Sequence, residues 1–550
     1  MNEHQGKITS SVEDGEDRDN SQTSPTSTTT PSSVTRHHED IQSNDSPKQL
    51  STRHAFAVLV SLQIGSGIFA SPAQVDSNVP SPGVALLIWL IGGLLSWAGA
   101  ASFAELGAAL PLNGGMQEYL RYVYGDTYAF LMAWIYIIAV KPSSMAIQSI
   151  VIADSIMSVA GLPKDGVPEG WLLKLFAISA LVAMVLLNSI STKTTLRASE
   201  SFTVIKLTTV LTIVIAGVSV LIIHVVKPTA APSGGTDWYS KNWFHSRPNL
   251  SGGIPIDWTE IGWWELLGHY SAAIYASLWA YDGWDSANFV ASEIRDPGRS
   301  LPLAIHSAMI VVLACYELVN TSYYILLPWD LLGSSSAVAV TAAKSLLGYP
   351  AGVVITILVS LSCAGAITSN LFSVGRLTVA ASQRGYLPQL FGNKGVPGCF
   401  NRKQRHRNEA RDPHPSEREP LISNTSDLPG TNVVENPTAL DAQWDAPIIA
   451  MLLSMSVTAA YIAVGDFPTL LTFVGMAEYV FYVSTVIALI ILRYREPDLQ
   501  RPYRPLLVIP VIFCLVGTAV IVRSVIFAPL QGALIAVLIV MGSLVGKLRG

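Results

Sequence analysis

Long apolar runs recur along this chain from Ala55 almost to its last residues. Each run covers about 20 mostly apolar residues, the length at which an α-helix crosses the hydrocarbon core of a bilayer. Charged residues make up 13% of the 550 residues, about half of their share in ordinary soluble domains. The sequence therefore predicts an all-α integral membrane protein.

Twelve of these runs are predicted to be transmembrane helices. The first six lie near residues 55–76, 84–109, 127–159, 171–190, 202–225 and 264–290. The second six lie near residues 303–328, 350–382, 446–464, 468–492, 505–526 and 529–547. An even number of spans puts both termini on one side. Lys and Arg in short loops stay cytoplasmic, and they concentrate on that side, so we expect both termini in the cytosol.

Three segments differ from the membrane domain expected over residues 51–547. Residues 1–50 are predicted to form a disordered cytoplasmic tail, and about 396–443 a disordered cytoplasmic insertion, because both are polar and lack apolar residues to bury. Residues 228–262 are aromatic as well as rich in Pro and Gly, so we expect them to pack as an extracellular loop. In the tail, Lys7, Lys48 and the hydroxyl groups offer sites to ubiquitin or phosphorylation machinery, or are simply solvated.

Several classes of protein do not fit this sequence. No basic stripe interleaves with aromatic residues, so we expect no nucleic-acid binding. The four cysteines lack metal-ligand spacing, and no phosphate-binding Walker loop occurs. No span holds paired carboxylates beside a nucleophile, and no continuous polar pore or charged ring suggests a channel. We therefore expect neither an enzyme nor a channel, and no metal or cofactor.

Two spans carry residues that break helices in the middle of the membrane. The first contains Gly65-Ser-Gly67 followed by Pro72, and the sixth contains Gly283 beside Asp282. Irregular backbone at membrane depth survives only where protein covers it or where it lines a polar cavity. A single such motif also fits helix packing through small residues, whereas two broken helices five spans apart are typical of inverted-repeat transporters with substrate at the breaks.

An unwound turn can hold both charges of an amino acid. The N-terminus of the half-helix after the break offers free N–H groups and the positive end of a helix dipole to the carboxylate. Carbonyl groups freed before the break attract the ammonium group. The pair of breaks therefore favours a site for a zwitterion near the middle of the membrane.

Several motifs in the same order resemble the L-type amino acid transporters of the amino acid-polyamine-organocation (APC) superfamily. They are Gly65-Ser-Gly-Ile-Phe-Ala-Ser-Pro72, Phe103-Ala-Glu-Leu-Gly107, Ala280-Tyr-Asp-Gly-Trp284, Glu293-Ile-Arg-Asp-Pro297, Arg384-Gly-Tyr-Leu-Pro388 and Arg495-Glu-Pro497. The likeness runs from about Arg53 to Lys547, interrupted by the polar insertion. Within the family, the sequence most resembles the single-chain fungal branch, which includes methionine permeases.

The resemblance implies a fold and an activity. The fold is a LeuT-like core of two inverted five-helix repeats with discontinuous helices 1 and 6, plus two further helices. The activity is secondary active transport of amino acids by alternating access, with large neutral substrates such as methionine. Cationic amino acids or polyamines, and an amino acid sensor with little flux, are alternatives. We expect the plasma membrane, with a vacuolar membrane as the alternative.

The resemblance also implies the residues that contact the substrate. The N–H groups of Ser66 and Gly67 would hold the carboxylate, with Gly65 permitting close approach. The ammonium group would lie near backbone carbonyls of both breaks. The expected substrate contacts are Ile64, Gly65, Ser66, Gly67, Trp279, Ala280, Asp282 and Gly283.

Gating and coupling roles fall to four residues. Trp279 matches an aromatic gate that closes over the substrate from outside, although a lipid-facing tryptophan is the alternative. Lys206 matches a lysine between the first, fifth and eighth spans, where distant relatives bind sodium, and so implies a carrier that needs none. A lysine that reaches for the membrane surface is the alternative. Lys141, before Pro142, matches a structural or gating position.

Asp282 departs from the glycine that is common in animal members of this family. Its carboxyl group could favour cationic substrates, tune the site by its charge or take up a proton. We expect Asp282→Asn to change the pH dependence of uptake. Residues 159–170 contain no cysteine, so we expect no disulfide-linked heavy chain.

Overall fold

The computed structural model describes residues 51–112, 114–162, 170–190, 192–227, 235–251, 254–289, 291, 294–335, 337–392 and 447–547. The predictions for the tail at 1–50 and the insertion at 396–443 lie outside the described residues. So do Glu293 and most of the connection between the third and fourth spans.

The all-α membrane fold is confirmed. Within the described residues, nine helical stretches are long and apolar enough to span a bilayer, and a bent pair of helices makes a tenth. Helices α10 (Trp263–Ala280) and α16 (Ile448–Val464) occupy the sixth and ninth predicted spans, which is consistent with twelve spans. The bent pair is α1 (Thr52–Gln63) with α2 (Gly67–Asp76), and the third span joins α5 (Asp126–Ile135), the π-helical turn η2 (Tyr136–Val140) and α6 (Lys141–Ala160). The remaining spans are α3 (Pro82–Ala109), α7 (Trp171–Ile190), α8 (Thr192–Val226), α11 (Pro297–Leu326), α14 (Tyr349–Gln383), α17 (Phe467–Arg495), α18 (Val508–Phe527) and α19 (Pro529–Lys547).

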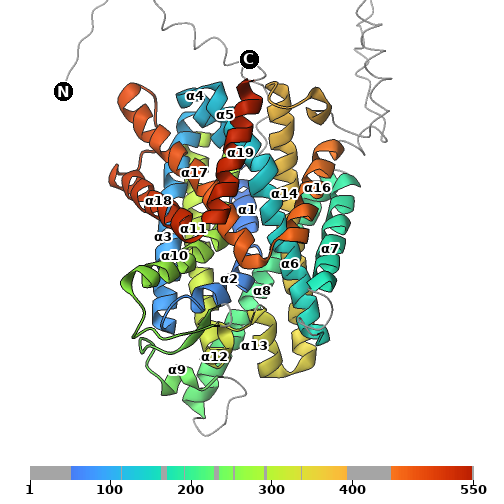
Figure 1. The fold of residues 1–550 in the computed structure, drawn as a ribbon, viewed down its shortest axis with the longest axis vertical. Coiled ribbons are helices and arrows are strands. Elements are labelled where there is room, and N and C mark those ends of the chain that lie inside the picture. The colour runs from blue at the N-terminus through green and yellow to red at the C-terminus, as the bar shows by residue number, and fades with distance from the viewer. Residues whose placement is uncertain are drawn as a thin grey trace, which may run out of the picture. The chain divides into compact units, whose positions relative to one another are not determined.

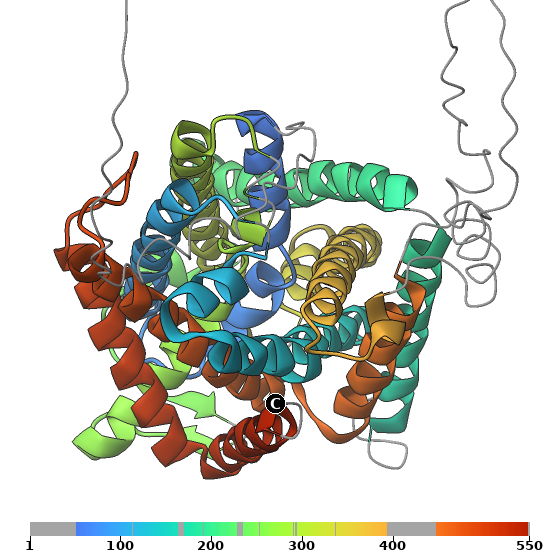
Figure 2. The same cartoon turned by 90° about the horizontal axis from the view of Figure 1, so that it is seen from above.

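Helices five spans apart pack against each other. Helix α3 contacts α11, α6 contacts α14, and α7 contacts α16. Two structural repeats related by a twofold axis in the membrane plane would bring such pairs together. The last two helices, α18 and α19, pack beside α17 and lie along one side of the bundle in Figure 2.

Short elements cover the two ends of the bundle. Helix α4 (Met116–Tyr124) lies at the end that carries the C-terminus of α19 (Figure 1). At the opposite end lie α9 (Asp237–Ser240), α12 (Trp329–Leu332) and α13 (Val338–Leu347). The loop between α8 and α10 also holds an antiparallel hairpin of β1 (Asn249–Ser251) and β2 (Ile254–Ile256), with Leu250 opposite Pro255. The loop expected at 228–262 is therefore ordered from residue 235 to 251 and from 254 onward.

Three helix ends differ from the predictions by six residues or more. Helix α8 begins at Thr192, ten residues before the expected start, because polar residues can extend a helix beyond its apolar part. Helix α10 ends at Ala280, where a helix to residue 290 was expected, since the break at Gly283 is not followed by another α-helix. Helix α11 begins at Pro297, and proline is favoured at the first turn because its missing N–H has no helical acceptor there.

The π-helical turn η2 has a local cause in the sequence. Pro142 has no N–H group to donate to the carbonyl of Ile138, four residues earlier. The hydroxyl group of Tyr461 donates to that carbonyl instead, at 3.2 Å. The widened turn places Lys141 at the start of α6.

Candidate functional site

The first break separates α1 from α2. The two helices meet at an angle of 43°, and the N–H of Gly65 turns back to the carbonyl of Gln63 at 2.8 Å. The first N–H groups of a helix have no acceptor inside it, so those at the start of α2, beginning with Gly67, are available to a ligand. This arrangement is the anion-binding end of a half-helix.

The second break follows α10. The N–H of Asp282 donates to the carbonyl of Trp279 at 3.1 Å, and Gly283 then adopts φ +102°. L side chains rarely adopt that conformation, so glycine suits the position. A single turn of 3-10 helix, η4 (Ser286–Phe289), follows the break.

The two breaks lie against each other. A Cβ atom added to Gly67 would fall 2.5 Å from the Cα of Ala280, so any side chain there would push the breaks apart. The hydroxyl group of Tyr316, on α11, lies 2.6 Å from the carbonyl oxygen of Gln63 and 2.9 Å from that of Ala280. Its single proton cannot serve both carbonyls fully, so one retains capacity to accept a hydrogen bond.

A small cavity of about 40 Å³, which we call the central cavity, opens between the breaks. Seven of the eight expected substrate contacts line it, namely Gly65, Ser66, Gly67, Trp279, Ala280, Asp282 and Gly283. Ile64 is buried in the same turn but is not among the lining residues. The amide group of Gln63 and the hydroxyl group of Ser66 are buried without a hydrogen-bond partner in the structure. Buried polar groups normally have partners, so these groups suit a polar ligand or water.

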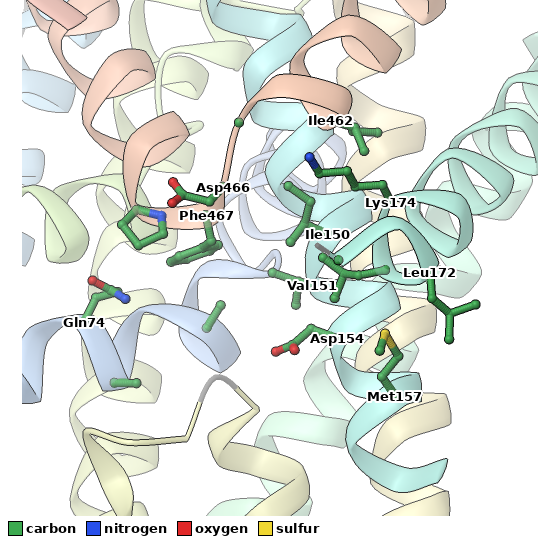
Figure 3. A pocket seen from close by; sticks show the side chains of 16 residues that line it. Gln74, Ile150, Val151, Asp154, Met157, Leu172, Lys174, Ile462, Asp466 and Phe467 are labelled. Atoms are coloured by element: carbon green, nitrogen blue, oxygen red, sulfur yellow. The ribbon is translucent and has the colours of Figure 1, made fainter. Parts of the chain in front are cut away.

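Trp279 lies between the central cavity and a second, larger cavity. The indole is 9% exposed and meets the ring of Phe467 edge to face, with ring centres 5.9 Å apart. Phe467 lines the larger cavity, which has a volume of about 400 Å³ and lies between α2, α6, α7 and the turn from α16 to α17. Figure 3 shows Gln74 of α2 and Asp154 of α6 on opposite sides of it. Trp279 therefore does not face lipid; it belongs to an aromatic partition between the two cavities.

Lys206 is fully buried and lies outside the central cavity. Its ammonium group donates to the carbonyl of Ser61 on α1, at 2.6 Å, and its side chain passes Gly365 of α14. The amine thus lies between the first, fifth and eighth spans, and it does not reach the membrane surface.

Lys141 does line the central cavity and faces carboxyl groups. Its Nζ atom lies 3.9 Å from Oε1 of Glu478, on α17. Electrostatic interactions also link Lys141 to Asp282 and Asp285. The hydroxyl group of Tyr482 donates to Oδ1 of Asp282 at 2.8 Å.

Several residues of this arrangement were not predicted, among them Tyr316, Asp285 and Glu478. Glu478 had a usable signal, since an acidic residue within an apolar run is by default a functional candidate. Asp285 directly follows the motif that ends at Trp284. Tyr316 had none, because a tyrosine in a membrane helix is unremarkable in sequence.

At the end of the bundle near α4, two side-chain contacts join separate elements. The hydroxyl group of Tyr119 donates to the side chain of Asn288, in η4, at 3.2 Å. Arg384 pairs with Glu118 at 3.2 Å. Among the described residues, no group of three or more His, Cys, Asp and Glu side chains is placed to hold a metal ion.

Comparison with known proteins identifies the family. The model of a family described as amino acid permease matches residues 50–544. The b(0,+)-type amino acid transporter 1 of Mus musculus is 28% identical over 92% of this chain and 89% of its own length. The cystine/glutamate transporter of Homo sapiens is 29% identical over 83% and 76%. The large neutral amino acids transporter small subunit 2 of Mus musculus is 28% identical over 87% and 76%. The chain therefore belongs to the amino acid permease family, as an L-type amino acid transporter of the APC superfamily.

Proposed function

We propose that this protein carries amino acids across a membrane by alternating access, with the substrate bound between the two helix breaks. The observation that carries the proposal is the central cavity itself. Free N–H groups at the start of α2 face it from one side, and the end of α10 with Asp282 faces it from the other. A zwitterion matches that arrangement of donors and acceptors.

The two charges of the substrate have separate binding groups in this proposal. The carboxylate accepts hydrogen bonds from the N–H groups of Ser66 and Gly67, where the dipole of α2 favours an anion. The ammonium group donates to the carbonyls of Ile64 and Ala280 and lies near Asp282. The unpartnered hydroxyl group of Ser66 gains a partner on binding.

The small size of the cavity supports alternating access. About 40 Å³ holds a few water molecules, whereas sites for small molecules usually measure about 300–1,000 Å³. The packed breaks must therefore separate to admit an amino acid. Trp279 and Phe467 would open one path, and the contact between Tyr119 and Asn288 would open the other.

The proposed substrates are large neutral L-amino acids, with methionine favoured by the resemblance to fungal permeases. Among the relatives, the names include large neutral amino acids, cystine and glutamate. The carboxyl group of Asp282 on the cavity wall favours the alternative of a cationic amino acid or polyamine. A sensor remains the alternative from another class, and only a flux measurement separates it from a carrier.

The proposed location is the plasma membrane, with α4 and the C-terminal end of α19 in the cytosol. Arg384, directly after α14, and Arg501, between α17 and α18, lie in loops near that end, and Lys and Arg in short loops stay cytoplasmic. The larger cavity behind Trp279 would then face outward. Attachment to a heavy chain through a disulfide is not expected.

Uptake into liposomes tests the proposal. The purified protein is reconstituted, and saturable uptake is measured for a panel of radiolabelled neutral, cationic and acidic amino acids. Gly67→Ala should abolish uptake, because the added Cβ would overlap Ala280. The control is Gly532→Ala in α19, where the added Cβ meets only Val525 at 3.5 Å, an ordinary contact.

Three outcomes separate the alternatives. Saturable uptake that only Gly67→Ala loses supports transport through the breaks. Binding without flux would favour the sensor. Equal uptake by Gly67→Ala and by the control would place the transport path elsewhere.

A further inference from the structure

A group of acidic residues behind the central cavity carries more negative charge than its surroundings balance. Asp282, Asp285 and Glu478 come from the sixth-span break and from α17, and among the described residues Lys141 is the cation that faces them. Asp285 is 1% exposed, Glu478 2% and Lys141 4%. We call these four residues the acidic cluster.

The other titratable groups facing the acidic cluster are phenols. They are Tyr136 on η2 and Tyr479 and Tyr482 on α17. The charged pair of Glu105 on α3 and Arg493 on α17 is satisfied separately. With every carboxyl group ionised, one ammonium group would face three carboxylates in a buried site. Burying an uncompensated charge is unfavourable unless the group becomes neutral.

Several polar atoms in and beside the acidic cluster have no hydrogen-bond partner, so a proton bound there could form a new hydrogen bond. Oδ2 of Asp285, Oε1 of Glu478 and the hydroxyl group of Tyr136 are all buried without a hydrogen-bond partner in the structure. Lys141 is 3.9 Å from Oε1 of Glu478, which is a loose ion pair rather than a hydrogen bond. A carboxylic acid would donate a hydrogen bond that a carboxylate cannot.

Resting on the proposed function, we propose that Asp285 and Glu478 form a proton-binding site and that transport through the central cavity moves a proton with the amino acid. The proton adds to one carboxylate oxygen from water on the outer side and leaves the same oxygen to water on the inner side. No other bond changes.

Asp282 connects this proton to the substrate. It lines the central cavity, where the ammonium group of an amino acid would lie, and it interacts electrostatically with Asp285 and Glu478 behind it. An arriving zwitterion brings one ammonium group, and its carboxylate is held by the start of α2. One negative charge then remains in excess, and a bound proton neutralises it. With the substrate carboxylate held by α2 and so counted apart, the acidic cluster and the ammonium group are therefore balanced when a proton is also present.

Glu317 is another acidic residue in the membrane helices, and its environment fits less well. It lies on α11, where it is half-buried and where Oε1 has no hydrogen-bond partner in the structure. It does not line the central cavity. Glu317→Gln is consequently the matched control, since it removes one carboxyl group from a membrane helix outside the acidic cluster.

Proton movement can be followed directly in the reconstituted system. Liposomes containing a trapped pH-sensitive dye receive methionine outside, and internal acidification is recorded beside uptake of radiolabelled methionine. An inward gradient of about two pH units should support accumulation of up to about 100-fold if one proton accompanies each substrate. Exchange of external for internal methionine is measured in parallel, because exchange needs no net proton movement and shows that a variant is folded.

The wild type should acidify on methionine addition. Glu478→Gln and Asp285→Asn should retain exchange while losing acidification and gradient-driven accumulation, and Glu317→Gln should retain all three. Uptake by the wild type without acidification would overturn the proposal, as would acidification that survives in both cluster variants or is lost only in Glu317→Gln. If the wild type neither binds nor moves any amino acid of the panel, the proposed function itself fails, which is a separate result.

Discussion

Gly283 holds a backbone conformation that determines the shape of the second break. At φ +102° an L side chain is strained by about 1–3 kcal/mol, and a Cβ there would lie 3.2 Å from the Cβ of Leu62 in α1. We expect Gly283→Ala to lower kcat/KM for uptake by at least about tenfold, since 1.4 kcal/mol corresponds to that factor.

The matched control is Gly348→Ala. Gly348 has φ +80° and so carries similar strain, but an added Cβ would meet only Pro350 at 3.9 Å, far along the chain from either break. Kinetics of methionine uptake, normalised to folded protein, compare the two variants. If both variants lose the same activity, strain alone accounts for the effect and the break has no special role.

From the buried position of the Lys206 ammonium group, we expect transport that needs no sodium. Its ammonium group is buried between α1, α8 and α14 and donates to the carbonyl of Ser61. Initial rates of uptake should therefore be equal in sodium and choline buffers. Lys206→Met leaves that carbonyl without its donor, at a cost of about 1–3 kcal/mol, and should reduce uptake.

Lys344→Met serves as the control for Lys206→Met. Lys344, on α13, also donates to a backbone carbonyl, that of Ser158, but at the end of the bundle away from the breaks. It should keep most of the uptake. A sodium requirement in the wild type would contradict the role given to Lys206.

Some individual residues of the candidate site could be predicted from the sequence and others could not, for physical reasons. Gly65, Gly67 and Gly283 could be found because breaking a membrane helix requires residues that are rare in the middle of spans. Tyr316 could not be found, because its role depends on the carbonyls that the fold brings to its hydroxyl group. Glu478 could have been singled out as an acid in a span, but the sequence does not show that it lies beside Lys141 and Asp282.

Among the elements, the loop between α8 and α10 is fastened to the end of α2. Arg247 pairs with the buried carboxylate of Asp76, and the hydroxyl group of Tyr324, on α11, donates to the same carboxylate at 2.6 Å. The side chain of Asn249 donates to the backbone carbonyl of Asp76 at 2.7 Å. If α2 moves during transport, the loop must move with it.

Arg247→Met should therefore destabilise the closed arrangement of α2. Removing one partner of a buried ion pair costs about 3–5 kcal/mol, because the other charge stays buried. We expect a lower midpoint of thermal unfolding in detergent. Adding Asp76→Asn should recover part of the loss, since no unpaired charge remains. A double variant that is less stable than Arg247→Met would show that the charge pair is not the cause.

The elements themselves were predictable where composition changes sharply. Helix α19 begins and ends at the predicted residues, 529 and 547, because Pro529 suits the first turn of a helix and Lys547 ends the apolar run. Helix α8 extends further than its apolar part, and hydropathy cannot detect a helix that leaves the hydrocarbon. The hairpin of β1 and β2 is held by contacts to α2 such as that of Asn249, which local sequence does not reveal.

For the whole molecule, the paired breaks allowed the sequence to predict two repeats, but not the polar contacts that join them to the last helices. Glu105 on α3 pairs with Arg493 of α17 and lies 3.4 Å from Arg501. Arg493 also donates to the carbonyl of Pro505, just before α18, at 2.8 Å. In the sequence these arginines indicate a cytoplasmic side, and Arg501 also belongs to a family motif, but neither feature shows that both lie beside Glu105.

Glu105 should contribute more to the stability of the assembled bundle than Glu118, although both pair with two arginines. Glu105 is fully buried with partners 4% and 5% exposed, whereas the partners of Glu118 are 34% and 47% exposed. Glu105→Gln would leave two guanidinium groups buried without a counter-charge, at a cost of about 3–5 kcal/mol. Glu118→Gln should cost about 0–1 kcal/mol, because water solvates its partners. Thermal unfolding of both variants in the same detergent measures the difference, and equal midpoints would mean that water reaches Arg493 and Arg501, so that α3, α17 and α18 are held together by apolar packing alone.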